Sequence, residues 1–499
     1  MKDIPDNSCI LNDNRYTVKF TLINTNTSID LPLGLVKQFV LYDNLYSIFQ
    51  TGKLIVDNSG SSLENFSSTE MNELREQINS VSYAFNSDNN DYLEVKIIPI
   101  TPKGEDAVTF PPEIFNMHFI FSVYAEEEYT ANKANDKTKV FYLRDGRAEK
   151  LLRSNIEWST SLAVQRQIGH KINVSQVSNK LRSIHTGYAL KHLIDTALQN
   201  SYPVSFANDW DIGRYEIFHT SPTQHNVMDD IEAILDKHVS FNDLDNCVLR
   251  WNNKRSEWSL KSFTQMFDEV LNKEEKAFGS RVSDAFHLHG SSTLSKGGAN
   301  LATKPLHEFS GNTILSQQLD GLTSYQFLNS ANDDGVNSLI SSIVHNYNYQ
   351  DKQFDVECSD GYIDNIEQTF QEFYADKMAG QDPTAIFPTN DDKKRNLMRK
   401  HVYTDAIMQE ERLRAGRNNV ISRALALSPG MSFSSKGGTH RDAGDFIIIS
   451  GEDANSGKRF AQVMYGEWLM TNVVHVFMFD REDYSNTITC IKPHTYSKI

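Results

Sequence analysis

The C-terminal end of the chain alternates apolar and polar positions in a way that is typical of antiparallel strands. Apolar and β-branched residues fill positions 446–449, 459–465, 468–479 and 486–491, and turn-forming residues separate these runs. No helical period interrupts them. Four short strand candidates joined by turns predict an antiparallel meander, which we assign to a C-terminal unit over 420–499.

The N-terminal third shows the same kind of pattern. Positions 16–22 alternate cleanly, and a run at 51–57 leads into a turn rich in Asn, Ser and Gly. Further strands are expected at 35–41, 45–49, 92–99, 117–124, 140–143 and 156–159, with a short helix at 70–78. This number of strands predicts a small barrel or sandwich over residues 1–160.

Between these two ends the period of the apolar residues changes. Positions 174–198 carry apolar residues at approximately helical spacing, which predicts a helical connector over 161–205. A small mixed α/β domain is expected over 206–270. Its expected elements are a strand at 215–219, a helix at 228–238 with Ile231, Ile234 and Leu235 on one face, a hairpin of 247–251 with 257–260, and a helix that starts at Ser262.

The segment that follows is less regular. Residues 271–340 are rich in Ser, Gly and Asn and predict an extended loop-rich insertion. Residues 341–419 predict strands plus helices, with strands at 343–349 and 354–356 and helices at 363–377 and 391–416. A chain of 499 residues is too long for one ordinary core, so several domains are expected. The fold class predicted from these patterns is α+β, mainly antiparallel β.

Charge and composition narrow the class of protein. The formal net charge is −16, which argues against a nucleic-acid coat or a protein that binds anionic membranes. Aromatic residues make up 11% of the chain, a share that suits sheets and large protein interfaces. No run approaches the roughly 18 apolar residues of a membrane span, and the acidic start at 1–6 is unlike a secretory signal.

The cysteines are sparse. Cys9, Cys247, Cys358 and Cys490 lie far apart and form no CxxC pattern. Such spacing predicts reduced, buried thiols and not a disulfide framework or a metal knuckle.

Two Ser-Lys-Gly-Gly segments, at 295–298 and 435–438, invite a phosphate-loop interpretation. Their glycines could expose backbone N–H groups and their lysines could pair with a phosphate. Neither matches GxxxxGK[ST], and neither lies between a strand and a helix. We interpret both as flexible turns.

Two histidine-containing segments are candidates for metal or catalytic sites. His287 and His289 could chelate an ion, but no nearby Cys, Asp or Glu completes a ligand set. Residues 439–442 read Thr-His-Arg-Asp and resemble a His/Asp pairing, yet no serine or cysteine nucleophile motif accompanies them. We expect a polar loop at 439–442 and predict no catalytic, metal or cofactor site.

Two charged runs have a functional and a structural interpretation. The three glutamates at 126–128 could supply the two carboxyl groups of a glycosidase or muramidase, which lie about 5–9 Å apart. A consecutive acidic run is more typical of a solvated face. The basic residues at 393–395, with Arg399 and Lys400, could meet an acidic partner or nucleic acid, or form a solvated helix face. No reaction centre emerges, so we expect the protein to work through its surfaces and not as an enzyme.

The C-terminal strands carry a resemblance to a known family. The run Gly-Glu-Trp-Leu-Met-Thr-Asn-Val-Val-His-Val-Phe at 466–477, followed by Tyr-Ser-Asn-Thr-Ile at 484–488 and Lys-Pro at 492–493, resembles the closing strands of baseplate hub proteins of contractile-tailed bacteriophages. The early strand pair at 46–57 and the Tyr-Glu-Ile-Phe-His-Thr-Ser-Pro segment at 215–222 are similar to that family as well. The matches are scattered over about half of the chain, and they are patterns without a catalytic signature.

The resemblance implies two tail-tube-like β-barrels per subunit, with 420–499 completing the second. It further implies a homotrimer whose six barrels adapt a hexameric tail tube to a trimeric central spike and surround a lumen for DNA. Trp468 and Phe477 would be core or interface anchors, and His475 a hydrogen-bonded histidine of a sheet face. Implied partners are the spike, the tube or its initiator, the tape measure protein and baseplate wedge proteins, in a virion assembled in the bacterial cytoplasm.

Other functional classes stay open at the level of sequence. A tail-associated cell-wall hydrolase is suggested by the glutamates at 126–128, and a host carbohydrate-binding module by the β-rich ends with Tyr and Trp. The sequence also does not separate a phage hub from the corresponding part of a tailocin or secretion device.

Overall fold

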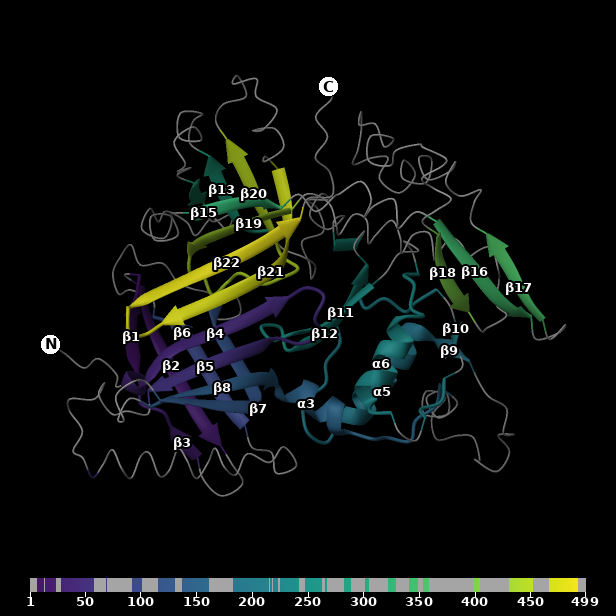
Figure 1. Ribbon diagram of the computed structural model, residues 1–499, viewed down its shortest axis with the longest axis horizontal. Coiled ribbons are helices and arrows are strands. Elements are labelled where there is room, and N and C mark those ends of the chain that lie inside the picture. Colours follow the sequence, from purple (N-terminus) through teal and green to yellow (C-terminus); the bar gives the residue numbers. More distant parts are fainter. Residues whose placement is uncertain are drawn as a thin grey trace.

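One large sheet organises the chain, as Figure 1 shows for the computed structural model. The structure describes residues 7–12, 14–23, 28–57, 69, 92–100, 115–130, 137–160, 183–214, 216–217, 219–222, 225–241, 247–262, 265–266, 282–288, 301–304, 322–328, 341–348, 353–358, 398–403, 430–451 and 466–491. The fold is α+β and mainly antiparallel β, as predicted. In these ranges no helix has both the length and the apolar character that crossing a bilayer requires.

The N-terminal part supplies eight strands of this sheet. They are β1 (Ser8–Leu11), β2 (Asn14–Ile23), β3 (Ser28–Asp30), β4 (Val36–Asn44), β5 (Thr51–Asp57), β6 (Tyr92–Pro99), β7 (Met117–Thr130) and β8 (Lys137–Asp145), with a 3₁₀ turn η1 (Leu33–Leu35) before β4. Their order in the sheet is β1-β2-β6-β7-β8-β5-β4, and β3 pairs with β2. Strands near in sequence are mostly neighbours in space, so most of this arrangement is built from hairpins.

The C-terminal strands continue the same sheet. They are β19 (Gly430–Lys436), β20 (Phe446–Gly451), β21 (Gly466–Met478) and β22 (Asp483–Ile491), joined by β13 (Val282–Leu288), β14 (Leu301–Lys304) and β15 (Leu322–Leu328). The path runs β14-β13-β20-β21-β22-β19-β15, and β21 also pairs with β4. Strands β13 and β20 are parallel, whereas the other paired strands that the structure describes in this sheet are antiparallel. Figure 1 shows the β21–β22 hairpin between the two strand groups.

The N-terminal sheet curls until its first strands reach the turn after β21. The Asn12 backbone N–H donates to the Glu482 carbonyl at 3.0 Å. The rings of Tyr16 and Tyr484 meet edge to face, with centroids 6.0 Å apart. The sheet therefore encloses its apolar face between the N-terminal strands and the C-terminal hairpin.

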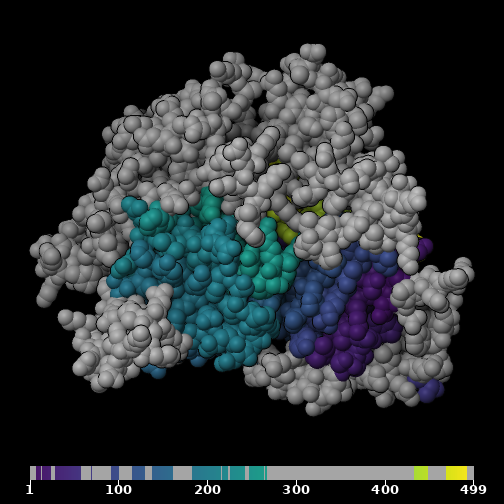
Figure 2. Space-filling model, turned by 180° about the vertical axis from the view of Figure 1, so that it is seen from behind, coloured from purple at the N-terminus to yellow at the C-terminus, as the bar shows by residue number. Residues whose placement is uncertain are grey.

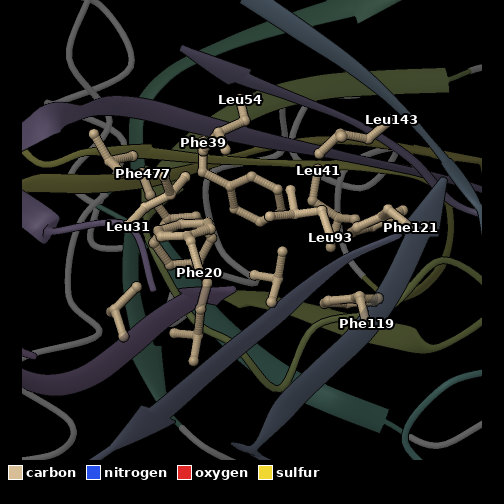
Figure 3. Close-up of a cluster of buried hydrophobic side chains, with 14 of the residues drawn as sticks. Phe20, Leu31, Phe39, Leu41, Leu54, Leu93, Phe119, Phe121, Leu143 and Phe477 are labelled. Atoms are coloured by element: carbon tan, nitrogen blue, oxygen red, sulfur yellow. The ribbon is translucent and has the colours of Figure 1, made fainter. Parts of the chain in front are cut away.

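Alternate residues of each strand fill this enclosed space, as the period of two predicts. The Phe39 ring of β4 lies 5.5 Å from the Phe20 ring of β2 and 5.9 Å from the Phe477 ring of β21. Figure 3 shows side chains from β2, β4, β5, β6, β7, β8 and β21 pointing toward one another in this core. Phe477 is fully buried there, and Trp468 is buried near the other end of β21. Both are core residues, in agreement with one of the two roles expected of them.

The middle of the chain forms a separate helical unit. Its elements are α3 (Gly146–Arg153), β9 (Ile184–His185), α5 (Thr186–Leu198), β10 (Glu216–Ile217), α6 (Val227–Leu235), β11 (Cys247–Asn252) and β12 (Glu257–Ser262). Its core contains Trp158, Trp210, Trp251 and Trp258 together with the apolar faces of the three helices. Figure 2 shows this unit beside the N-terminal strands on one face of the molecule.

Local signals determine where these helices begin. Asn226 accepts a hydrogen bond from the Asp229 N–H at 2.9 Å, and Asp229 accepts one from the Asn226 N–H at 3.3 Å, which is a capping box at the start of α6. The Asp145 carboxylate accepts from the Arg147 N–H at 2.8 Å at the start of α3. A further sheet has the order β17-β16-β18, with β16 (Ser341–Asn348), β17 (Gln353–Cys358) and β18 (Met398–Tyr403).

Several predicted elements are confirmed. The C-terminal meander is β20-β21-β22, and the hairpin predicted around 252–255 is β11–β12 with Trp251 opposite Trp258. The predicted helix at 228–238 is α6, with Ile231 and Ile234 fully buried. The strands predicted at 343–349 and 354–356 are β16 and β17. The Ser262 hydroxyl accepts from the Gln265 N–H at 2.9 Å, as expected of a helix cap.

Other predictions are wrong. Residues 45–49 form a turn and not a strand, because Asn44 accepts from the N–H groups of Tyr46 and Ser47. Residues 156–159 are irregular apart from one bridge between Ser159 and Thr220. Of the helix predicted over 174–198, the structure describes residues from 183 onward, where β9 precedes α5 and the helix begins at Thr186. Within the strand predicted at 215–219, β10 covers Glu216–Ile217, and residues 215 and 218 lie outside the described ones.

Two longer segments also differ from expectation. The helix predicted over 391–416 contains β18, which pairs in parallel with β16. The segment 271–340, predicted as an extended loop, contributes β13, β14 and β15 to the large sheet. In both cases pairing with a distant strand determines the conformation, and local composition does not report such pairing. The helices predicted at 70–78 and 363–377 and the strand at 459–465 lie outside the described residues, apart from 69 beside the first.

Replacing Phe477 with Ala should lower stability by about 3–5 kcal/mol, because it removes a fully buried ring from the enclosed core. Val476→Ala is the matched control, since Val476 is the preceding residue on the opposite face of β21 and should cost about 1 kcal/mol. Thermal and urea unfolding of both variants measure the difference. Equal destabilisation by the two changes would contradict the placement of Phe477 in the core.

Candidate functional site

The C-terminal hairpin is the place where the two strand groups meet. Strand β21 pairs with β20 through Gly466–Leu469 and with β4 through Asn472–Met478. Between these two stretches, its register with β22 shifts between Met470 and Asn472. A bulge of this kind bends a strand and increases its twist. One strand thereby pairs with both strand groups of the large sheet.

The backbone groups around this bulge are paired with protein groups. The Gly444 N–H donates to the Met470 carbonyl at 2.8 Å, and the Met470 N–H donates to the Asp445 carbonyl at 2.9 Å. On the other side, the Leu45 N–H donates to the Thr471 carbonyl at 2.8 Å. The backbone groups of Met470 and the Thr471 carbonyl therefore stay hydrogen-bonded where β21 changes its partner strand, although the strand ladder is interrupted there.

A buried ion pair joins three distant parts of the chain beside the bulge. Asp43, near the end of β4, is almost fully buried and accepts a hydrogen bond from Arg250 of β11. The Arg250 guanidinium also donates to the Ala443 carbonyl. The backbone N–H of Ala443 in turn donates to the second carboxylate oxygen of Asp43 at 2.8 Å. The N-terminal sheet, the middle unit and the C-terminal loop are thus linked through one carboxylate.

Further polar contacts extend this junction. Lys254 pairs with Asp442 at 2.8 Å, and the Asn253 amide donates to the Gln50 side chain. The backbone N–H of Trp251 donates to the Ile48 carbonyl at 3.0 Å. Burial raises the pKa of Asp43, whereas the Arg250 guanidinium and the Ala443 N–H oppose that rise. We refer to the contacts among Asp43, Arg250, Lys254, Asp442 and Ala443 as the junction network.

A second buried polar cluster underlies the C-terminal hairpin. Arg441 is fully buried and donates to the Ser435 hydroxyl at 2.7 Å, the Lys436 carbonyl at 2.6 Å and the Asn486 side-chain oxygen at 2.8 Å. Arg441 belongs to the Thr-His-Arg-Asp segment at 439–442, which is a polar loop as predicted, but a buried one. Hydrogen bonding to β19 and β22 makes it a structural element of the sheet.

The Ser-Lys-Gly-Gly segment at 435–438 is bound to the same hairpin. The Gly437 N–H donates to the Tyr484 carbonyl at 2.7 Å, and the Gly438 N–H donates to the Asn486 side chain at 2.6 Å. A Cβ on Gly437 would lie 2.2 Å from the Tyr484 ring, so only glycine allows this close approach. Both N–H groups are used within the protein and are not available to a phosphate. Ser435 and Lys436 end strand β19, so this half of the segment is a strand and not the flexible turn that was predicted.

His475 of β21 is fully buried in the same region. Its Nδ1 lies 2.8 Å from the Tyr484 hydroxyl and 2.9 Å from the Asn486 Nδ2 atom. Burial lowers the pKa of His475 to about 3, with Lys254 and Arg441 lowering it further and Asp442 opposing them. The neutral ring therefore accepts at Nδ1, whereas its buried Nε2 has no hydrogen-bond partner among the described residues.

The three glutamates at 126–128 lie on β7. Successive side chains of a strand point to opposite faces, so Glu127 faces away from Glu126 and Glu128. Glu126 pairs with Lys139 at 3.3 Å. Glu127 accepts from the hydroxyls of Tyr129 and Tyr142, and these hydrogen bonds lower its pKa. A glycosidase acid requires a raised pKa, so this run does not supply one in Glu127.

The remaining sequence candidates are only partly described. His287 lies on β13, whereas His289, the segment 295–298 and the basic residues at 393–395 lie outside the described residues. Arg399 and Lys400 lie on β18, which is a strand and not the helix face that was expected.

A polar cluster in the middle unit was not predicted from the sequence. The Asp211 carboxylate accepts from the Gly213 N–H at 2.7 Å and from the Ser240 hydroxyl at 2.8 Å. His238 is buried beside it, with Nε2 3.4 Å from Asp211 Oδ1. Burial alone would raise the pKa of Asp211, but His238, Gly213 and Ser240 outweigh that effect and lower it. These residues come from separate loops, and no local sequence pattern connects them.

Replacing Arg250 with Met should destabilise the protein by about 3–5 kcal/mol, because Asp43 would remain as a buried charge without its partner. Adding Asp43→Leu to that variant should recover part of the loss, since removing both charges is less costly than removing one. Lys19→Met is the control, because the Lys19–Asp30 pair is largely solvent-exposed and should contribute about 1 kcal/mol or less. Thermal unfolding measures all three, and an equal effect of the Arg250 and Lys19 changes would contradict a buried junction.

The pKa of His475 generates a pH dependence with a defined sign. The folded protein takes up this proton only near pH 3, whereas the ordinary pKa of histidine is 6.5. Between these values the unfolded chain binds more protons, so stability should fall as the pH decreases, by up to about 1.4 kcal/mol per pH unit. His475→Gln should flatten this dependence in unfolding experiments between pH 6.5 and pH 4.5, a window inside that interval. His118→Gln is the control, because His118 lies at an exposed position of β7, and this variant should keep the pH dependence of the wild-type protein.

Comparison with known proteins gives structural similarities only. Neither a family model nor a curated protein sequence matches the chain. The chain is similar to the tail protein from Neisseria meningitidis MC58, with a TM-score of 0.45, 8% identity and coverage of 95% of this chain and 96% of that one. It is also similar to the 43 kDa tail protein of prophage MuSo2 from Shewanella oneidensis, with a TM-score of 0.43, 7% identity and coverage of 96% and 98%. For a Francisella PdpA–VgrG complex the TM-score is 0.43, with 9% identity and coverage of 97% and 59%. With TM-scores below 0.5, these similarities carry no functional conclusion.

Proposed function

We propose that this chain is a structural virion protein, the trimeric hub of a contractile-tail baseplate, which adapts a hexameric tail tube to a trimeric central spike. The observation that carries the proposal is the C-terminal hairpin, which is shared by two groups of strands in one chain. A chain with two such groups presents two sheet units to its surroundings. Three chains around one axis then present six.

A sixfold tube and a threefold spike cannot share one symmetric interface directly, so an adaptor between them must match both symmetries. Closed rings of identical subunits repeat every contact at each subunit. A ring of three identical chains has exact threefold symmetry. Because each chain carries two sheet units, the same ring has approximate sixfold symmetry. It can therefore contact a sixfold tube on one side and a threefold spike on the other.

The outer face of the N-terminal sheet has the chemistry of a subunit interface. Tyr42, Tyr124 and Tyr129 are exposed by 42%, 47% and 54% on β4 and β7. The Arg144 guanidinium lies 4.5 Å from the centre of the Tyr124 ring, and the Lys53 ammonium lies 5.5 Å from that of Tyr142. Tyr and Arg are enriched at protein interfaces, where they supply large contact areas and cation–π contacts. We assign this tyrosine face to contacts between subunits.

The net charge of −16 fits a protein that surrounds a DNA channel without binding the DNA. In this proposal the partners are two further copies of the chain, the spike protein, and the tube or its initiator. Tape measure and wedge proteins would make additional contacts. The protein would assemble in the bacterial cytoplasm and act in the tail baseplate of the virion.

A cell-wall hydrolase is the less favoured alternative. Its suggested carboxylates at 126–128 point to both faces of β7, and Glu127 is held in its charged form by two tyrosine hydroxyls. A carbohydrate-binding module has the exposed tyrosines in its favour, but the same residues are accounted for by subunit contacts. We therefore assign the protein no enzymatic activity.

The purified protein should form either a species of three times its chain mass of 56.8 kDa or, when mixed with the spike protein, a complex with three copies of each chain. Tyr124→Asp should shift the mass toward the single chain by placing a charge in the tyrosine face, without lowering the unfolding temperature of the monomer. Tyr188→Asp is the control, because Tyr188 is an exposed tyrosine on α5, away from this face. Light scattering after size exclusion measures all three proteins. A wild-type monomer in both conditions would contradict the proposed function.

A further inference from the structure

Three possible metal ligands converge in the middle unit. They are Asp211 in the loop before β10, His238 after α6, and Cys247 at the start of β11. One ligand atom from each residue lies within 4.8 Å of the others. A carboxylate, an imidazole and a thiol brought together from three separate segments form a set of donors that transition-metal ions bind.

The orientation of His238 suits a metal ligand. Its Nδ1 lies 2.8 Å from the Thr186 hydroxyl, a contact that fixes the ring. Its Nε2 is buried, and among the described residues its contact is with Asp211, at a geometry that does not make a hydrogen bond. This nitrogen faces Asp211 Oδ1 at 3.4 Å. When Nδ1 carries the proton and donates it to Thr186, a lone pair on Nε2 faces a carboxylate oxygen, and a cation between the two is favourable.

The observed separation matches that of two ligands on one ion. In a tetrahedral zinc site, with Zn–N and Zn–O distances near 2.1 Å, the nitrogen and oxygen lie about 3.4 Å apart. With a Zn–S distance near 2.3 Å, the sulfur lies about 3.6 Å from each of them. The imidazole and carboxylate are therefore already at ligand spacing. The Cys247 sulfur, within 4.8 Å, completes the set through a small side-chain movement.

The surrounding hydrogen bonds suit a metal site as well. Ligating histidines commonly bond through their second ring nitrogen, as His238 does with Thr186. Ligating carboxylates are commonly held by further donors, and Asp211 accepts from the Gly213 N–H and the Ser240 hydroxyl. These contacts preorganise two of the three ligands in the folded protein.

We propose that Asp211, His238 and Cys247 bind a divalent transition-metal ion of the zinc type, with a fourth position open to water or to a partner's side chain. The thiol selects against Mg²⁺ and Ca²⁺, which prefer oxygen ligands. As the metal–sulfur bond forms, the Cys247 thiol releases its proton to solvent, so the ligand is the thiolate. No metal site was predicted from the sequence, because the three ligands stand far apart along the chain.

The position of the site gives the ion a structural role. Cys247 begins β11, the strand that carries Arg250 of the junction network. Thr186 and His238 tie the site to the start of α5 and the end of α6. A bound ion would hold the hairpin against the helices and so stiffen the connection between the middle unit and the large sheet. This inference does not depend on the proposed baseplate function.

The test uses the full-length protein after removal of metals by a chelator and dialysis. Addition of Co²⁺ should produce a thiolate-to-cobalt charge-transfer band that saturates at one ion per chain, and Zn²⁺ should abolish the band. Zn²⁺ should also raise the unfolding temperature. Cys247→Ser should remove the band, whereas Cys9→Ser, at another half-buried thiol, should retain it.

Thr186→Val separates a metal site from a structural hydrogen bond. It keeps all three ligands but loses the contact to Nδ1, so it should weaken Zn²⁺ binding by about 10–100-fold without abolishing it. Absence of the cobalt band in the wild-type protein would overturn the proposal, even if the variants failed to fold. A band that persisted unchanged in Cys247→Ser would overturn it as well.

Discussion

The structure depends on the pairing of one strand, β21, with two different neighbours. Its first part completes the ladder with β20, and its second part completes the ladder with β4. A strand that changes partner must bend, and the register shift between Met470 and Asn472 provides that bend. The two strand groups are consequently not free to move as independent domains, because the same backbone runs through both.

The buried polar contacts follow from this arrangement. Where β21 changes partner, neighbouring backbone and side chains would lose hydrogen bonds unless other segments supplied them. The loop containing Ala443 supplies some of these bonds, and it is held in turn by Asp43 and Arg250. A buried ion pair adds little net stability compared with apolar packing, but breaking it is costly. The junction network therefore acts mainly to define one relative arrangement of the sheet and the middle unit. For a protein proposed to transmit contacts between a tube and a spike, such a fixed arrangement is a requirement.

Local elements could be predicted from the sequence, because their signals are local. The β11–β12 hairpin has a four-residue polar turn between tryptophan-containing runs, and α6 has a capping residue and an apolar face. The C-terminal meander alternates with period two along its length.

Distant pairings could not be predicted in this way. The contact of β4 with β21 and the entry of β13, β14 and β15 into the sheet depend on surfaces that form only when the whole chain folds. Arg441 is a related case, since a charged residue in a polar loop gives no sign that it will be fully buried. The possible ligands Asp211, His238 and Cys247 come from three segments. They are distant in sequence and meet only in the folded chain, so no sequence motif could predict them.

The central claim is that three copies of this chain form a ring with six sheet units around a channel. Single-particle electron microscopy of the protein, alone and mixed with the neighbouring spike protein, tests it most directly. We predict particles with threefold symmetry, an open centre, and two strand groups per subunit that together approach sixfold symmetry. Particles of a single chain in both samples, or a closed twofold dimer, would contradict it.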